Sequence, residues 1–297
     1  MIYTLRHETR YDYSRPVDLS AHVLHLTPLR LPWQRVISCE LNADPAPARL
    51  RSAVDCFGNT AHWMFLDAPH PEFRAVLSAV VAVDAPPPPA PDATLCWEDV
   101  ATIAKLGGRD GFAVAEFLFA SAMVAPFADA SGYTRTSFPA GRSIMAGVWD
   151  LTLRIRRDFS FRAGVTEIGT PLSQVLQQRA GVCQDFAHLM IAGLRGIGLP
   201  ARYASGYIRT RPPKNGVRRR GADQSHAWVS CWLGPDHGWI DLDPTNGLII
   251  ADEHVVLAYG RDYADVSPLA GVILGGGAHR VHVSVDLEPT ETAEAAQ

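Results

Sequence analysis

Residues 181–197 read GVCQDFAHLMIAGLRGI, and the neighbouring segments can be interpreted around this stretch. Phe186, Met190 and Leu194 recur at the spacing of one helical face, which predicts a helix packed into a core. The Gly-Leu-Pro sequence at 198–200 ends the helix, because proline cannot continue it. The sequence therefore predicts a buried helix of about four turns at the centre of the fold.

A thiol lies in the first turn of this helix, at Cys183. The unpaired N–H groups and the dipole at a helix N-terminus favour an anion, and so they favour the thiolate, the nucleophilic form of cysteine. The alternative is a buried structural cysteine, since free cysteines are often packed in cores. Asp185 follows in the same turn, where a carboxylate complements the helix dipole, and we expect it to cap the helix.

Two alternating segments downstream, 225–233 and 238–243, predict an antiparallel hairpin. In this register Asp243 is a direct or diagonal neighbour of His226, close enough for its carboxylate to orient the imidazole. The other acid of the strand, Asp241, lies farther from the histidine. The alternatives are a structural histidine and an aspartate that caps its own turn.

Together, these three residues match the chemistry of a cysteine nucleophile. The imidazole of His226 would take the proton of the Cys183 thiol, and Asp243 would fix the tautomer of the ring and stabilise its charged form. A metal-dependent hydrolase is a weaker interpretation, because the sequence contains neither an HExxH motif nor paired CxxC motifs.

The rest of the chain divides by pattern and composition. Residues 1–85 contain several short alternating runs and predict a small β-rich domain. Residues 86–93, PPPPAPDA, predict a stiff linker. Residues 94–290 predict a catalytic domain, and 291–297 a frayed acidic tail. The fold class expected is α+β, with helices packed on an antiparallel sheet after the β-rich domain.

Within the predicted catalytic domain, helical periodicity extends beyond the central helix. The spacing of apolar residues predicts helices over 112–122 and 143–157. Alternation predicts further strands over 202–208 and 280–287.

The composition excludes several classes of protein. The 297 residues include 27 basic and 31 acidic ones, a net charge of -4 that argues against a general nucleic-acid-binding protein. We find no signal-peptide pattern and no apolar run of about 18 residues, so we expect a cytoplasmic protein without a membrane partner. The five cysteines have no metal-site spacing, and we expect no metal or other cofactor. A basic loop at 209–224 could select an acidic substrate, although a solvated loop is the simpler interpretation.

Several blocks of the sequence resemble the bacterial transglutaminase-like family, members of which are also described as cysteine proteases. Four blocks occur in the family's order, at 181–189, 202–207, 225–229 and 238–246. The DCFGN sequence at 55–59 is similar to the family's N-terminal β region, and GRDYADVSP at 260–268 is similar to its closing segment. The resemblance thus covers nearly the whole chain.

This resemblance implies a papain-like transglutaminase core with Cys183 as nucleophile, His226 as base and Asp243, the aspartate directly before Pro-Thr, as orienting carboxylate. It does not imply calcium dependence, because no segment resembles the calcium-binding loops of animal transglutaminases. Tyr207 and Trp228 lie in two of the blocks and are the candidate substrate-binding residues.

We therefore expect an enzyme that transfers an acyl group through a thioester and hydrolyses amide bonds of a peptide or protein substrate. A protein-glutamine cross-linking transglutaminase is one alternative. A non-catalytic peptide-binding module that keeps the fold is another. The sequence leaves the oligomeric state open.

Overall fold

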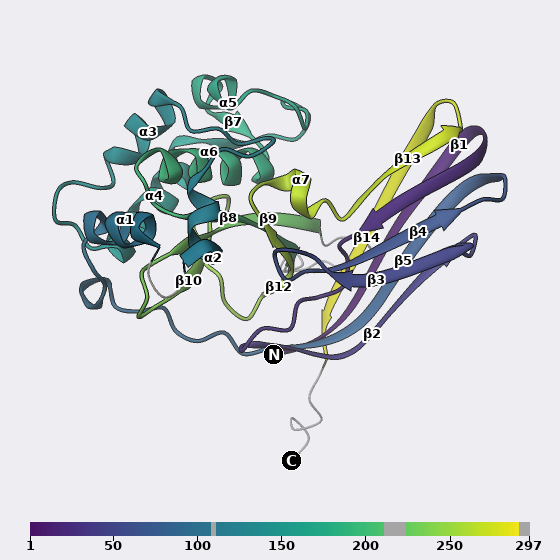
Figure 1. Ribbon diagram of the computed structural model, residues 1–297, viewed down its shortest axis with the longest axis horizontal. Helices are drawn as coiled ribbons and strands as arrows, with labels where there is room; N and C mark the ends of the chain where they lie inside the picture. Colours follow the sequence, from purple (N-terminus) through teal and green to yellow (C-terminus); the bar gives the residue numbers. More distant parts are fainter. Residues whose placement is uncertain (108–110, 211–223, 291–297) are drawn as a thin grey trace, which may run out of the picture.

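The computed structural model describes residues 1–107, 111–210 and 224–290. A layer of helices covers one sheet, and a second sheet of long strands projects from this part (Figure 1). The predicted α+β class, with helices packed on an antiparallel sheet after a β-rich N-terminal region, is confirmed.

The projecting sheet is built around one long strand. The strand order is β2-β5-β1-β4-β3, and β13 and β14 also pair with β1. The first half of β1 pairs with β5 and β14, and its second half pairs with β4 and β13, all in antiparallel register. The strands are β1 (Ile2–Leu24), β2 (Gln34–Asp44), β3 (Arg49–Val54), β4 (Thr60–Leu66), β5 (His70–Val83), β13 (Leu269–Gly275) and β14 (His279–Pro289).

The last two strands, β13 and β14, pair with the N-terminal sheet. The predicted catalytic domain, 94–290, included the strand at 280–287, whereas the structure pairs β13 and β14 with β1 in the N-terminal sheet. Alternation in the sequence predicts that a segment is a strand, but it does not predict which strand pairs with it. Here β13 and β14 pair with the edge of β1 that would otherwise be open. The boundaries at residues 85 and 93 stay predictions.

The second sheet has the order β11-β10-β9-β8-β12. Its strands are β8 (Ala201–Ile208), β9 (Gln224–Trp232), β10 (Trp239–Asp243), β11 (Leu248–Ile249) and β12 (His254–Gly260). The helices are η1 (Pro91–Ala93), α1 (Trp97–Leu106), α2 (Gly111–Ala115), η2 (Glu116–Leu118), α3 (Ala128–Arg135), α4 (Ile144–Asp158), α5 (Leu172–Gln178), α6 (Cys183–Gly196) and α7 (Tyr263–Val266), with a parallel pair β6 (Ser160–Phe161) and β7 (Ala180–Gly181). None of the helices in the described ranges is long and apolar enough to cross a membrane.

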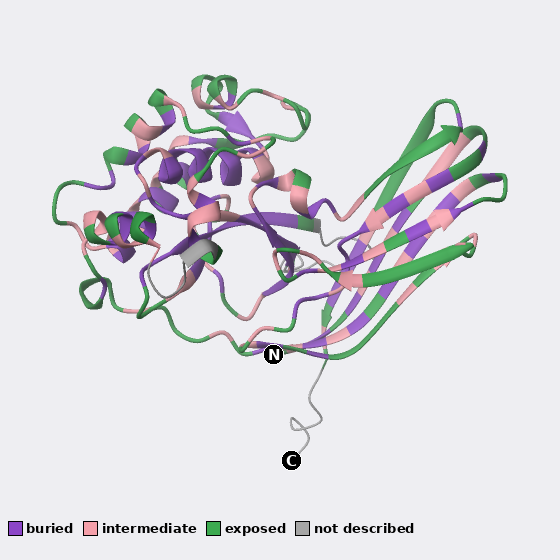
Figure 2. Cartoon of the chain, in the orientation of Figure 1, coloured by how far each residue is buried: buried purple, intermediate pink, exposed green. Residues whose placement is uncertain are grey.

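The central helix predicted from the sequence is α6, and it begins at Cys183 as expected. Figure 2 shows most of it buried between the other helices and the sheet, and only its ends are half-buried. Its apolar residues share one core cluster with Val229 and Cys231 of β9. The absence of a side chain at Gly193 allows close packing, because a Cβ atom there would collide with the Thr134 side chain of α3.

The helix predicted over 112–122 is wrong in its second half. The structure has α2 and the short η2 turn, and the chain becomes extended at Phe119. The buried guanidinium of Arg195 donates hydrogen bonds to the Phe119 carbonyl and to the Ser121 hydroxyl, at 3.0 and 3.2 Å. These tertiary contacts replace the hydrogen bonds that a continued helix would make.

Two buried amide side chains dock the N-terminal sheet onto the edge of the second sheet. Gln34 exchanges two hydrogen bonds with the backbone of Val256 on β12, both of 2.8 Å. Asn59 exchanges two more with the backbone of Tyr259, also of 2.8 Å. The DCFGN block therefore has a structural use, since Asp55 in turn holds the Asn59 amide at 2.8 Å. Each amide side chain thus forms with the edge of β12 the backbone hydrogen bonds that a neighbouring strand would form.

Replacing Asn59 with alanine is expected to lower the free energy of unfolding by about 2–4 kcal/mol, because it leaves two buried backbone groups of Tyr259 without partners. Urea denaturation of the full chain measures this change. The matched control is Asn42→Ala, since the exposed side chain of Asn42 bonds only to Glu40 among the described residues. Equal losses in the two variants would show that the Asn59 contacts do not hold the sheets together.

Candidate active site

The thiol and the histidine singled out in the sequence lie in one cavity of about 540 Å³. Cys183 is the first residue of α6 and is half-buried. His226 lies near the start of β9 and is 8% exposed. The helix packs on the sheet so that its N-terminus meets this end of β9.

The histidine is held from behind by Asp243. The Nε2 atom of His226 lies 2.7 Å from Oδ2 of Asp243. In the β9–β10 register, Leu242 faces Val229, which makes Asp243 a diagonal neighbour of His226, as predicted. The second carboxylate oxygen, Oδ1, accepts hydrogen bonds from the backbone N–H groups of Thr245 and Asn246. These two hydrogen bonds hold the carboxylate of Asp243 in place independently of its contact with the imidazole.

Burial and charge act in opposite directions on this pair. Burial alone would lower the pKa of His226, but hydrogen bonding and charge from Asp243 and Cys183 raise it to about 10. Burial alone would raise the pKa of Asp243, but the hydrogen bond and charge of His226 hold it well below its ordinary value. At neutral pH the arrangement is thus an imidazolium beside a carboxylate, and the sulfur of Cys183 lies close to the same ring.

Asp185 caps the helix that carries the thiol, as predicted. Its Oδ2 atom accepts a hydrogen bond from the backbone N–H of Val182 at 2.8 Å and another from the hydroxyl of Thr166 at 2.7 Å. Gly181 is required beside it, because a Cβ atom there would collide with the Asp185 carboxylate. These contacts fix the turn from which Cys183 projects.

The structure does not bring Tyr207 and Trp228, the candidate substrate-binding residues, into the cavity that holds Cys183. Both side chains are fully buried. The Tyr207 hydroxyl lies 2.7 Å from Nδ1 of His7 on β1, and the Trp228 indole donates to Asp241. Both stand on sheet faces covered by the rest of the fold, which the alternation of a single strand does not reveal. The basic loop at 209–224 lies largely outside the described residues.

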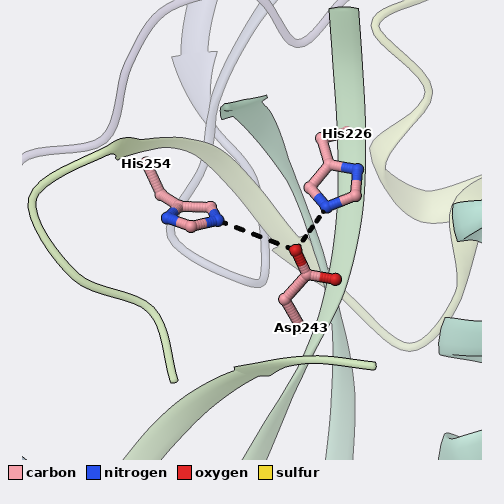
Figure 3. Close-up of side chains that lie close together, drawn as sticks. All are labelled: His226, Asp243 and His254. Atoms are coloured by element: carbon pink, nitrogen blue, oxygen red, sulfur yellow. Dashed lines mark hydrogen bonds and ion pairs between the residues drawn. The ribbon is translucent and has the colours of Figure 1, made fainter. Parts of the chain in front are cut away.

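Sequence reasoning missed a third buried group beside Asp243. The Nε2 atom of His254 on β12 lies 3.8 Å from Oδ2 of Asp243, on the side opposite His226 (Figure 3). Neither ring nitrogen of His254 has a hydrogen-bond partner among the described residues. No local motif marks this histidine, and β9 and β8 separate its strand β12 from β10 in the sheet.

The three side chains offer one ligand atom each within 4.8 Å of one another, so we tested whether they fit a metal ion. Two ligands at about 2.0–2.1 Å from a tetrahedral zinc ion are about 3.3 Å apart. The Nε2 atom of His226 and Oδ2 of Asp243 are only 2.7 Å apart, a distance that suits a shared proton. As arranged, the pair forms a hydrogen bond and does not fit a metal.

Two family models and several relatives match this chain. Residues 3–82 match the model of the bacterial transglutaminase-like N-terminal region, and residues 142–244 match that of the transglutaminase-like superfamily. An uncharacterized protein of Mycobacterium tuberculosis is 38% identical over 297 residues, covering 97% of this chain and 93% of that protein. The chain belongs to the transglutaminase-like superfamily. The second match includes Cys183, His226 and Asp243.

Other relatives in the superfamily differ in extent. An uncharacterized protein of Mycobacterium leprae is 30% identical, covering 95% of this chain and 96% of that protein. A protein-glutamine gamma-glutamyltransferase of Pseudomonas aeruginosa is 39% identical over 69 residues, which are 23% of this chain and 10% of that enzyme. A crystal structure from Cytophaga hutchinsonii, of a protein proposed to be a cysteine protease, matches with a TM-score of 0.73 and 21% identity. It covers 99% of this chain and 92% of that chain. At this identity the likeness shows the fold.

Proposed function

We propose that the protein is a cysteine-dependent acyl-transfer enzyme that hydrolyses peptide or isopeptide bonds through Cys183, His226 and Asp243. The observation that carries the proposal is the buried Asp243–His226 pair, 2.7 Å apart, in the cavity that also holds the thiol of Cys183. An imidazole held in this way takes the proton of a thiol and returns it to a leaving amine.

The reaction has two steps. The Cys183 sulfur attacks the carbonyl carbon of the substrate amide, the C–N bond breaks, and the amine leaves with a proton from His226. Water then attacks the thioester carbon and gives its proton to His226. The C–S bond breaks, and the carboxylic acid leaves. The backbone N–H of Cys183, in the first turn of α6, is available to the oxyanion, since a helix leaves its first N–H groups without internal acceptors.

A second cavity favours water over a lysine side chain as the acceptor. It has a volume of about 490 Å³, lies against His226 and is lined by Arg156 and Arg209. None of the described residues that line it is acidic. Two guanidinium groups repel a lysine ammonium that approaches His226 from this side. The relative named protein-glutamine gamma-glutamyltransferase supports transamidation as the second candidate function.

The test is to incubate the protein with a peptide mixture in ¹⁸O-labelled water, with and without methylamine, and to identify products by mass spectrometry. Hydrolysis is expected to place ¹⁸O in new carboxyl groups, with methylamide products in the minority. A Cys183→Ser variant is expected to react at least about 100-fold more slowly than the parent. Circular dichroism checks that this variant is folded. A majority of methylamide products would favour the transferase. Identical product patterns in parent and variant would contradict a role for the thiol.

A further inference from the structure

The N-terminal sheet forms one wall of the cavity that holds Cys183. His7, Thr9 and Tyr11 of β1 line this cavity together with Val281, Val283 and Val285 of β14. The register pairs them directly across the two strands, His7 with Val285, Thr9 with Val283 and Tyr11 with Val281. Directly paired residues share one face of a sheet, so these six side chains form a continuous inner wall opposite the thiol.

Apolar side chains of this inner wall are left uncovered. Val281 is 46% exposed and Val283 55% exposed, although the adjacent Val285 is buried. A smaller cavity of about 200 Å³ shares Tyr11 with the first and continues along the same face past Tyr13 and Ile273. The uncovered surface therefore extends away from the thiol along the length of the sheet, beside β13 and β14 (Figure 1).

The two faces of this sheet differ in charge. Within the described part of the chain, no Asp, Glu, Lys or Arg lines either of these two cavities. Burial lowers the pKa of His7 to about 4, so this histidine is neutral at physiological pH. The alternate residues of β1 point to the other face and are charged, with ion pairs such as Arg6–Glu8 and Arg10–Asp12. The wall that faces the thiol is thus the uncharged face of an amphipathic sheet.

We propose that this inner wall binds the acyl-donor segment of the substrate, and that it selects an extended segment of uncharged, apolar residues. The proposal rests on the proposed function of Cys183. An apolar segment covers the exposed valines and removes their surface from water. A carboxylate or ammonium group placed against the inner wall loses its hydration and finds no opposite charge on the six side chains that form the wall.

The experiment labels Cys183 with two bromoacetyl tripeptide amides, one of three leucines and one of three aspartates. The sulfur displaces bromide and forms a thioether, and mass spectrometry measures the rate at the Cys183 peptide. Iodoacetamide gives the rate without a peptide, and the exposed Cys56 gives an internal reference. In the parent protein, the leucine probe is expected to label Cys183 at least tenfold faster than the aspartate probe, with no such preference at Cys56.

The variant is Val283→Asp, which places a charge on the inner wall and is expected to reduce the preference to less than twofold. Val272→Asp is the matched control. Val272 is a 72% exposed valine of β13, and it points to the other face because its neighbours Gly271 and Ile273 line the inner one. The control is expected to keep the parent's preference. Val281→Asp repeats the test if circular dichroism shows that Val283→Asp does not fold.

Two failures are distinguishable. If iodoacetamide labels Cys183 no faster than Cys56, the proposed function of the thiol fails, and with it the inference. If iodoacetamide labels Cys183 faster but the leucine probe has no advantage, the selection of an apolar segment is overturned. If the leucine probe still labels Cys183 faster than the aspartate probe in folded Val283→Asp and Val281→Asp, the inner wall is not the source of the preference.

Discussion

Replacing His226 with alanine is expected to slow the alkylation of Cys183 by iodoacetamide about 30-fold at pH 7. An isolated thiol with a pKa of about 8.5 is only about 3% ionised at this pH, and only the thiolate reacts. In the parent, Asp243 and Cys183 raise the pKa of His226 to about 10, so a cation stays beside the sulfur across the neutral range. Removing the imidazole removes the charge that stabilises the thiolate.

The pH profile makes this test sharper. The rate for His226→Ala is expected to rise about tenfold per pH unit below pH 8.5, as for an isolated thiol. The parent is expected to depend less on pH, because its imidazolium keeps its charge until about pH 10. The matched control is His237→Ala, since His237 is an exposed histidine in the turn after β9. Equal rates in the parent and both variants would show that His226 does not activate the thiol of Cys183.

Changing Asp243 to asparagine is expected to lower the rate of hydrolysis by about 10⁴-fold, the size of effect known when a triad aspartate loses its charge. The amide can still accept the backbone N–H groups of Thr245 and Asn246 through its oxygen. Its NH₂ group then faces Nε2 of His226, where the carboxylate accepted a hydrogen bond at 2.7 Å. The imidazole loses both its orientation and the charge that stabilises its protonated form.

The neighbouring acid provides the control for this variant. Asp241 is buried two residues away, and its Oδ2 atom accepts hydrogen bonds from Trp228 and from Tyr259. An asparagine oxygen can accept both bonds, so Asp241→Asn is expected to change the rate less than about tenfold. Release of ¹⁸O-labelled product measures both variants, and thermal unfolding checks that they fold. A similar loss in both variants would assign the effect of Asp243 to the stability of the sheet.

The elements that carry the three proposed catalytic residues could be predicted because their signals are local. The helical spacing of apolar residues and the Gly-Leu-Pro stop define α6 within 20 residues of sequence. Alternation and a short turn define the β9–β10 hairpin, whose register then restricts Asp243 to the neighbourhood of His226. Each of these features depends on residues close in the chain.

The features that the sequence did not predict depend on contacts between distant residues. The helix expected over 112–122 ends early because Arg195, more than 70 residues away, binds the chain at Phe119 and Ser121. Tyr207 and Trp228 stand in blocks typical of the family, yet the fold covers both completely. Residue type and strand alternation cannot tell which face of a central strand meets a cavity and which meets another part of the core.

Local patterns in the sequence were sufficient to predict the order and type of the central elements and to single out the three residues proposed for catalysis, because periodicity and turn chemistry act over a few residues. The folded chain was needed to show that β13 and β14 return to β1, that His254 lies beside Asp243, and that an uncharged inner wall faces Cys183. These features join residues up to 286 positions apart, as in the pairing of Tyr3 with Pro289. Pairings of that range follow from the packing of the whole chain, and no local pattern records them.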